Sequence, residues 1–314
     1  MGLGTPVVVA DRVSAPRVPG VAPGQRGAAI ASAIWRFCRR KPLGAVGGLL
    51  VLIMIVMALG ADWIARYPYD ETIRGARLKA PSAEFWMGTD NLGRDVYSRV
   101  VYGARISISV GFGAVLLSNV LAALIGITSG YFGGKYDMAV QRVVDAWQSF
   151  PFLVVILSIM AVLGPGLLNV IIALGVLGSA GASRIVRGAT IAVAQHQYIE
   201  AARALGAGHV RIMTRYIVPN VLATIIVIAT IGLGGFILAE SALSFLGFGV
   251  PPPYPSWGAM LSGSGRSFFY RAPWMAVWPG VAISLAVFGF NMLGDALRDV
   301  LDPRLRGQGG RPVR

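Results

Sequence analysis

Long stretches without a charged residue constrain this chain more than any other feature of its sequence. Residues 42–61, 106–134 and 146–183 are mostly apolar and contain no Asp, Glu, Lys or Arg, and the stretches 216–239 and 272–294 are of the same kind. A helix needs about 20 such residues to cross the hydrocarbon core of a bilayer. The sequence therefore predicts an all-α, polytopic membrane protein.

The stretch 146–183 is too long for a single span. Gly164-Pro165-Gly166 interrupts it, because proline lacks a backbone N–H and glycine frees the backbone. We therefore expect two helices, at 138–163 and 167–184, and six transmembrane helices in all. The expected segments are a tail at 1–41, a first transmembrane helix at 42–61, an external loop at 62–103, a five-helix core at 104–298 and a tail at 299–314.

Composition excludes several other classes of protein. Charged residues make up 13% of the chain, about half the usual share of roughly 25% in globular proteins, so the bulk of the chain is not disordered. A single cysteine excludes an intrachain disulfide, and two histidines exclude a Cys/His zinc cluster. The net charge of +14 lies at the ends of apolar runs, which is typical of cytoplasmic loops rather than of a nucleic-acid-binding face.

The distribution of basic residues predicts the orientation in the membrane. Four basic residues lie between positions 36 and 41, directly before the first span, which predicts a cytoplasmic N-terminus. Six spans return the C-terminus to the cytoplasm and place the loop at 184–215 there as well. The loop at 62–105 is then external. It carries seven basic residues, but it also carries six acidic ones, and long loops escape the rule.

The loop between the fourth and fifth spans reads as a compact docking element. Residues 200–205 are strong helix formers, and Gly206 and Gly208 permit the left-handed turn that ends a helix. A second amphipathic piece starts at Val210, and Pro219 opens the next span. Small and charged side chains on such an element suit close contact with a partner protein.

This loop resembles the EAA loop of ABC-importer permeases. Glu200, Ala201, Ala202, Gly206 and Pro219 match that pattern at its spacing, while Tyr216 stands where the family usually has an aliphatic residue. The resemblance implies that residues 186–219 contain the coupling helix that docks on the ATP-hydrolysing subunits. The implied contact residues are Glu200, Ala201, Ala202, Arg203, Leu205, Gly206, Ala207, His209 and Arg211.

Three further segments resemble the dipeptide, oligopeptide and nickel permeases of the DppC/OppC type. They are Met87–Arg99 with Tyr102–Ser107, Glu240–Gly249 with the prolines and Trp that follow, and Ala272–Pro303. The resemblance covers residues 35–306 and implies the ABC type I importer (MetI-like) permease fold. Asp90, Arg94, Pro252, Trp257 and Trp274 are candidates to face a binding protein. A purely structural interpretation of the first segment is an Asx turn followed by a helix cap.

Polar residues inside the predicted spans are candidates for a transport pathway or gate. They are Asn119, Asn169, Glu240 and Asn291. Polar side chains within membranes are costly and often functional, although each asparagine also suits a hydrogen bond between helices. Glu240 is expected at the outer edge of the fifth span, where water can solvate it. Arg142 and Asp145 are three residues apart and are expected to form a structural ion pair.

The chain carries no phosphate loop of the form Gly-x-x-x-x-Gly-Lys-Ser/Thr, and we predict that it is not an enzyme and binds no cofactor or metal. ATP and Mg would be bound by partner subunits. The resemblance implies a heterodimer with a homologous permease, two ABC ATPase subunits and an extracytoplasmic substrate-binding protein, in the cytoplasmic membrane of a prokaryote. Contact with membrane lipid is expected, and contact with nucleic acid is not.

The predicted function is import of short peptides by alternating access. A nickel or nickel-chelate importer is the alternative within the same family. An ion-coupled carrier or channel, from a different class, should show paired intramembrane acids or an inverted repeat, and neither is visible in the sequence. A membrane scaffold is a further alternative, which predicts no transport.

Overall fold

The computed structural model describes residues 35, 37–39 and 41–301. The chain divides into two units, Met1–Arg40 and Lys41–Arg314, and the helices from α2 onward belong to the second. The predicted tails at 1–41 and 299–314 lie almost entirely outside the described residues.

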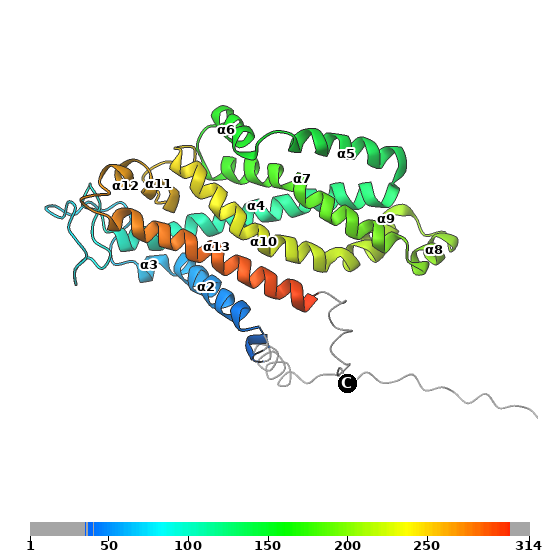
Figure 1. Cartoon of the computed structure of the whole chain (residues 1–314), viewed down its shortest axis with the longest axis horizontal. Helices are drawn as coiled ribbons and strands as arrows, with labels where there is room; N and C mark the ends of the chain where they lie inside the picture. Colours follow the sequence, from blue (N-terminus) through cyan, green and yellow to red (C-terminus); the bar gives the residue numbers. More distant parts are fainter. Residues whose placement is uncertain (1–34, 36, 40, 302–314) are drawn as a thin grey trace, which may run out of the picture. The chain divides into compact units, whose positions relative to one another are not determined.

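The described part of the second unit is helical and contains no β-strand beyond one isolated bridge between Thr89 and Asp95 (Figure 1). The longer helices are α2 (Pro42–Leu59), α4 (Val96–Phe132), α5 (Gly134–Gln148), α6 (Phe152–Leu163), α7 (Leu167–Ala194), α10 (Val218–Phe245) and α13 (Trp274–Leu301). Short helices lie in the connections: α3 (Ala61–Ile64), α8 (Gln197–Ala204), α9 (His209–Ile212), the π-helix η1 (Met213–Ile217), α11 (Trp257–Leu261) and α12 (Gly263–Ser267).

Five helical segments are long and apolar enough to cross a membrane, and one bent pair is a sixth candidate span. The pair is α5 and α6, which meet at 85°. The straight helix predicted at 138–163 is therefore wrong. Pro151 stands between the two halves and is the N-cap of α6, and proline cannot continue a helix because it lacks the N–H and its ring clashes with the preceding turn.

Three spans are longer than hydropathy predicted. α4 begins at Val96, ten residues before the predicted start, because the Asp95 side chain caps it by accepting from Ser98 N at 2.8 Å. α7 continues ten residues past the predicted end at 184, and α10 continues past 239 to Phe245. In each case polar residues extend the helix beyond the uncharged stretch, because caps, hydrogen bonds and ion pairs satisfy them.

Close helix contacts at glycines hold the bundle together. α4 packs most extensively on α7, and α13 lies against both α10 and α2. At Gly126 of α4 an added Cβ would lie 2.5 Å from Ser183 O of α7, and at Gly47 of α2 it would lie 2.8 Å from Gly289 O of α13. Small residues at such positions allow the backbones to approach, which is the usual way that helices associate in membranes.

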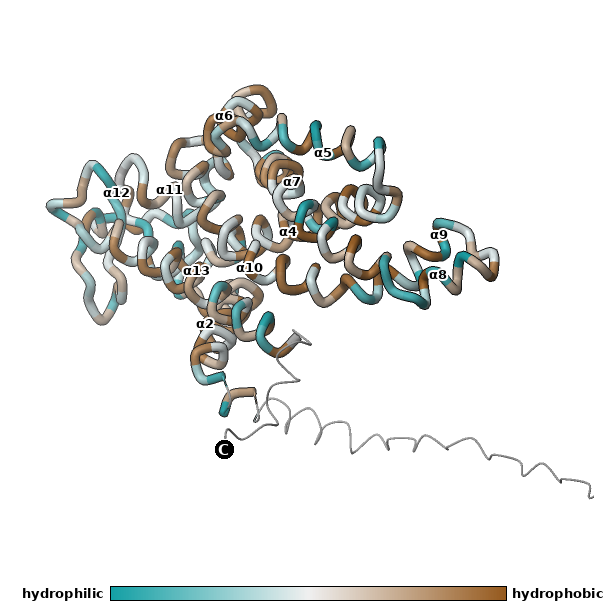
Figure 2. Tube along the Cα trace, turned by 45° about the vertical axis from the view of Figure 1, so that its right-hand side comes forward, coloured by the Kyte–Doolittle hydropathy of each residue, from teal (hydrophilic) through white to brown (hydrophobic). Residues whose placement is uncertain are grey.

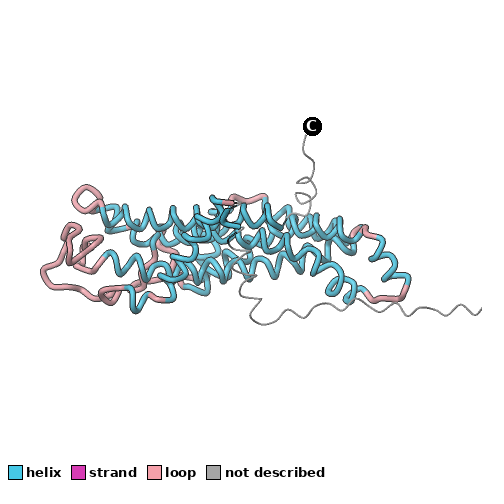
Figure 3. Tube along the Cα trace, turned by 90° about the horizontal axis from the view of Figure 1, so that it is seen from below, coloured by secondary structure: helices cyan, strands magenta, loops and turns pink. Residues whose placement is uncertain are grey.

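The connections gather at the two ends of the helix bundle (Figure 3). α8 and α9 lie at one end, which we call the α8–α9 end, and α3, α11 and α12 lie toward the other, the α11–α12 end (Figure 1). An ion pair of 2.5 Å between Lys41 Nζ and Asp299 Oδ2 joins the start of α2 to the end of α13. The start of α2 and the end of α13 therefore lie side by side.

Hydrophobic residues predominate along α2, α4, α7 and α10 (Figure 2), and many of their large apolar side chains are exposed. On α2, Leu49, Leu52 and Val56 are each more than half exposed in the isolated chain. A helix face of this kind requires lipid or another apolar surface to cover it.

Candidate functional site

The α8–α9 segment is anchored by buried aliphatic residues and presents a mixed surface outward. Ile199 and Ile212 are fully buried in a cluster with Ile127, Val186 and Ile217. This anchoring leaves α8 and the turn after it projecting from the bundle, as Figure 1 shows. The segment therefore has a fixed base and a free face.

The turn between α8 and α9 depends on glycine. Gly206 has φ +79°, its N–H donates to Arg203 O at 2.9 Å, and Ala207 N donates to Ala202 O at 3.0 Å. These two bonds form a Schellman motif, which requires a left-handed residue at this position. The predicted left-handed turn is thus present at Gly206. It is absent at Gly208, whose φ is −68°.

Apolar side chains stand out on the free face of the α8–α9 segment. Leu205 is 88% exposed and Val210 is 70% exposed, and Glu200, Ala201 and Arg211 are exposed beside them. Ala202, by contrast, is buried and belongs to the base. Val210 is missing from the set of contact residues that the sequence predicted, although its spacing of two residues from Ile212 places the two on opposite faces of a helix. Leu205 and Val210 thus give the free face of this polar segment an apolar component.

Tyr131, at the end of α4, connects the bundle to this segment. Its Oη lies 2.9 Å from His209 Nδ1, and the Arg203 guanidinium lies 5.2 Å above its ring. The Phe132 ring also lies against His209, with ring centroids 5.6 Å apart. Arg203 and His209, both predicted as partner contacts, therefore also bind α4. The sequence gives no signal for Tyr131, which lies at the end of an apolar stretch.

Two ion pairs join α5 to α7 toward the α8–α9 end. Arg187 Nε donates to Asp137 Oδ1 at 2.6 Å, and Arg184 pairs with Asp145. The predicted pair of Arg142 with Asp145 is present but long, at 3.9 Å. From the sequence alone, Arg184 is expected at the start of a basic loop. The structure instead uses it, and Arg187, to hold α5 on α7.

Asn119 faces a cavity inside the bundle. The cavity has a volume of about 240 Å³ and lies between α4, α7 and α10, lined by residues that include Ser118, Gly178 and Phe236. Asn119 Nδ2 donates to Val115 O at 2.9 Å, while its buried Oδ1 has no hydrogen-bond partner among the described residues. This oxygen is itself shielded from solvent, so it is an unsatisfied buried acceptor beside the cavity.

The other two asparagines lie elsewhere. Asn169 Nδ2 donates to Leu163 O at 2.8 Å and to Gly164 O at 3.1 Å, so this side chain closes the break between α6 and α7. Asn291 lies on an exposed position of α13 next to Gly234 of α10. The three asparagines therefore do not line one common pathway in this chain.

Glu240 is enclosed in the bundle, whereas the sequence predicted a solvated position at its edge. It is fully buried, and the Ser244 hydroxyl donates to its Oε1 at 2.6 Å. The hydroxyls of Ser107 and Ser241 lie 3.4 Å from Oε2. None of the ion pairs in the described part of the chain includes this carboxyl. The prediction failed because α10 continues past 239 and α11 covers its end.

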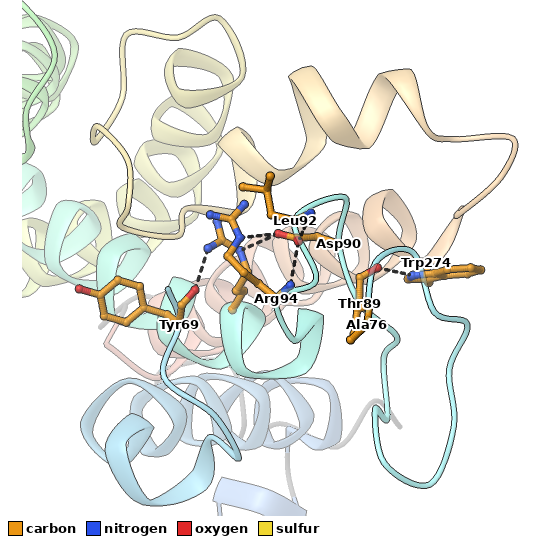
Figure 4. Close-up of polar contacts among 8 residues, drawn as sticks. Tyr69, Ala76, Thr89, Asp90, Leu92, Arg94 and Trp274 are labelled. Atoms are coloured by element: carbon orange, nitrogen blue, oxygen red, sulfur yellow. Dashed lines mark hydrogen bonds and ion pairs between the residues drawn. The ribbon is translucent and has the colours of Figure 1, made fainter. Parts of the chain in front are cut away.

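Asp90 organises the segment before α4 at the α11–α12 end (Figure 4). Its Oδ1 accepts from Leu92 N at 2.8 Å and from Arg94 N at 2.9 Å, which is the predicted Asx turn. Its Oδ2 accepts from Arg94 Nε at 2.6 Å and lies 3.9 Å from Arg99 Nε. Asp90 thus holds the Arg94 guanidinium in place and lies close to that of Arg99.

The two arginines line a pocket of about 140 Å³, which we call the guanidinium pocket. Its lining comes from the segment before α4, the start of α4, the chain after α10, α11 and the start of α13. The lining residues are Asp90, Arg94, Val96, Arg99, Val250, Pro252, Tyr254, Ala259, Met260 and Met275. Asp90, Arg94 and Pro252, which the sequence selected as candidates, therefore come together, and Arg99 and Tyr254 join them.

The two predicted tryptophans do not line this pocket. Trp257 is 1% exposed and its Nε1 donates to Val100 O at 2.9 Å, so it fastens α11 to α4. Trp274 is half-buried and its Nε1 donates to Thr89 O at 3.0 Å (Figure 4). Both hold the α11–α12 end together, and Trp257 has no surface left for a partner.

Electrostatic contacts also tie α3 to α4 at this end. The Arg105 Nη2 donates to Asp62 Oδ2 at 3.0 Å, and this hydrogen bond lowers the pKa of the Asp62 carboxyl below its usual range. The phenol of Tyr69 lies in the loop that follows, and burial raises its pKa. The Tyr69 ring stacks on Tyr254 with centroids 5.8 Å apart, so this loop reaches the rim of the guanidinium pocket.

Comparison with known proteins gives two family matches. Residues 122–307 match the model described as "Binding-protein-dependent transport system inner membrane component". Residues 31–81 match the "N-terminal TM domain of oligopeptide transport permease C".

Similar curated proteins span nearly the whole chain. The dipeptide transport system permease protein DppC of Alkalihalophilus pseudofirmus is 42% identical over 268 residues, 85% of this chain and 88% of that protein. The glutathione transport system permease protein GsiD of Escherichia coli O6:K15:H31 is 40% identical over 274 residues, 87% of this chain and 90% of that protein.

One solved structure shows the same fold. It is an inward-facing conformation of the MetNI methionine ABC transporter, with a TM-score of 0.52 and 19% identity. The match covers 65% of this chain and 96% of that one.

Proposed function

This chain belongs to the family of binding-protein-dependent transport system inner membrane components, and from that premise we propose that it carries short peptides into the cell by alternating access. As a member it is a permease of an ABC importer of the peptide type, not an enzyme, and it lies in the inner membrane. The substrate, the partner chains and the movement are the parts that we propose.

The observation that carries the proposal is the α8–α9 segment. Its base is anchored by buried Ile199 and Ile212, and its free face exposes Leu205 and Val210. The segment lies within the residues that the sequence predicted to contain the coupling helix. An ATPase subunit that grips this face can displace the segment as a unit, because the base is packed rather than loose. The contact of Tyr131 with Arg203 and His209 would then pass the displacement to α4.

We propose that a homologous permease pairs with this chain and that substrate passes between the two. The apolar outer faces of the helices supply a surface for such a partner as well as for lipid. Two ABC ATPase subunits would bind ATP and Mg at the α8–α9 end, and this chain would bind neither. The α8–α9 end would be cytoplasmic, with both termini on that side, and the α11–α12 end would face the substrate-binding protein.

Short peptides are the proposed substrate because the similar proteins are named for dipeptide and for glutathione, which is itself a small peptide. Alternating access requires that ligands bind the inward-open and outward-open states with different affinities.

Uptake into proteoliposomes tests this function directly. The chain is purified with its co-purifying permease and ATPases, reconstituted with ATP on the side of the ATPases, and supplied with the substrate-binding protein and labelled di- or tripeptides. We expect uptake that requires ATP and stops when the Walker lysine of the ATPase is replaced. Uptake of chelated nickel but not of peptide would replace the proposed substrate. Uptake that follows an ion gradient without ATP would contradict the ABC mechanism.

A further inference from the structure

The guanidinium pocket has more hydrogen-bond donors than acceptors. Asp90 is its only lining carboxylate, and both of its oxygens are occupied by backbone N–H groups and by Arg94. Arg99 Nη1 donates to Tyr69 O at 2.8 Å, and its Nε is only loosely paired, 3.9 Å from Asp90. Across the described residues, the two Nη groups of Arg94 and Nη2 of Arg99 make no hydrogen bond.

These free donors are held rather than mobile. The side chains of Arg94 and Arg99 are 17% and 10% exposed, and apolar residues such as Val96 and Met275 form the neighbouring walls. A guanidinium fork presents paired N–H groups that match a carboxylate, and partial burial strengthens that interaction. The unsatisfied chemistry of the pocket is therefore that of a carboxylate site.

The size and place of the pocket select the source of the carboxylate. About 140 Å³ is well below the roughly 300 Å³ at which small-molecule sites begin, so the pocket holds one side-chain head and not a peptide. It lies at the α11–α12 end, at a junction of loops and helix starts, whereas the Asn119 cavity lies within the bundle between α4, α7 and α10. Tyr254, 51% exposed, stands at its rim, available to an approaching surface.

We propose that the guanidinium pocket receives an Asp or Glu side chain of the substrate-binding protein when that protein docks on the permease. This rests on the proposed function, which puts the α11–α12 end on the outer side of the membrane. Arg94 and Arg99 bind the carboxylate, Asp90 positions Arg94, the Tyr69 carbonyl positions Arg99, and Tyr254 covers the contact from the rim. The pocket thus fixes the register of docking by charge and by shape.

The test measures affinity of the purified substrate-binding protein for the importer assembly in nanodiscs. Arg94→Gln and Arg99→Gln are expected to weaken binding about tenfold or more, because each leaves the buried partner carboxylate short of donors. Both should flatten the decline in affinity between about 0.05 M and about 0.3 M salt. Arg99→Lys keeps the charge without the fork and should fall between wild type and Arg99→Gln.

Arg77→Gln is the matched control. Arg77 is an exposed arginine of the same segment, lies outside the pocket and forms no side-chain hydrogen bond among the residues described. Its replacement removes the same charge and is expected to change affinity by less than about twofold. If Arg99→Gln does not assemble, the variants Arg94→Gln and Tyr254→Ala still test the pocket, because Arg94 is less buried than Arg99 and Tyr254 is exposed.

A scan of the binding protein identifies the other half of the contact. Its surface Asp and Glu residues are changed one at a time to the amide, and one of them should show an effect that is not additive with Arg94→Gln. Normal affinity in Arg94→Gln and Arg99→Gln overturns the proposal. The proposal is also overturned if the variants bind the substrate-binding protein normally but no longer take up dipeptides with a free C-terminus, while they still take up dipeptides with an amidated C-terminus. That result would assign the pocket to the substrate. A wild-type assembly that neither binds the protein nor transports would instead refute the proposed function.

Discussion

The Ser244 hydroxyl donates a hydrogen bond of 2.6 Å to Glu240 Oε1, one turn earlier on the same helix, in a part of α10 that is closed to solvent. Ser107 brings α4 into the same group of polar atoms, with its hydroxyl 3.4 Å from Oε2. The carboxyl thus links two helices through hydroxyls. Because α11 begins with a Ser256 cap nearby, this link lies where the bundle meets the α11–α12 end.

Glu240→Gln is expected to preserve both assembly and uptake, because serine hydroxyls donate and accept and can serve an amide as well as a carboxyl. Glu240→Ala leaves those hydroxyls without their partner and is expected to lower stability by about 1–3 kcal/mol. Thermal unfolding in detergent measures both variants. An equal loss of stability in Glu240→Gln and Glu240→Ala would show that the carboxyl itself is needed. Normal stability in Glu240→Ala would show that the hydrogen bonds of Glu240 are dispensable.

Gly206→Val is expected to uncouple ATP hydrolysis from uptake without disturbing the spans. A side chain at φ +79° costs about 1–2 kcal/mol, so the turn between α8 and α9 should shift, although no neighbouring atom blocks it. Gly208→Ala is the matched control, since Gly208 is equally open but has φ −68°. Peptide taken up per ATP hydrolysed is the readout. Wild-type coupling in Gly206→Val would remove the α8–α9 segment from the coupling mechanism.

Tyr131→Phe removes the hydrogen bond to His209 while it keeps the ring beneath Arg203. We expect a partial loss of coupling, with a fall in uptake larger than the fall in ATP hydrolysis, because one of two links between Tyr131 and the segment is gone. Tyr136→Phe is a suitable control, since Tyr136 of α5 is exposed and its hydroxyl donates to Thr128 of α4, not to the α8–α9 segment. An identical response of the two variants would mean that Tyr131 transmits nothing.

Asp137→Asn should loosen α5 from α7, because Asp137 accepts from Arg187 and also from Ser129 of α4. A half-buried, charge-assisted pair of this kind contributes about 1–3 kcal/mol. The double change Asp137→Arg with Arg187→Asp should recover part of the lost stability in thermal unfolding. No recovery in the double variant would show that the geometry around Ser129, and not the charge pair, provides the stability.

The proposed orientation can be read from cysteine labelling in intact cells. Cys38 is the only cysteine, so a Cys38→Ser chain is a clean background. Val210→Cys and Tyr254→Cys occupy exposed positions at opposite ends of the bundle. A membrane-impermeant maleimide should label position 254 from outside and position 210 only after lysis. The reverse pattern would invert the topology and place the guanidinium pocket in the cytoplasm.

Uncharged runs were enough to predict a helical membrane protein, for which the structure offers five or six candidate spans, because each span must bury about 20 apolar residues whatever surrounds it. The position of the docking turn was also predictable, because only glycine readily adopts the backbone of Gly206. Both inferences rest on local chemistry, which a sequence contains in full. The family resemblance drew on the same local motifs.

Tertiary structure decided everything that depends on a neighbour. Glu240 was predicted to be solvated and Arg184 to begin a loop, but packing enclosed the first, and an ion pair with Asp145 kept the second in a helix. Val210 and Leu205 are exposed on the free face of the α8–α9 segment because Ile199 and Ile212 are buried against the bundle. Arg94 and Arg99 line a pocket because Val250, Pro252 and Tyr254, in the chain after α10, lie next to them. Burial and pairing are properties of residues distant in sequence, and the fold brings those residues together.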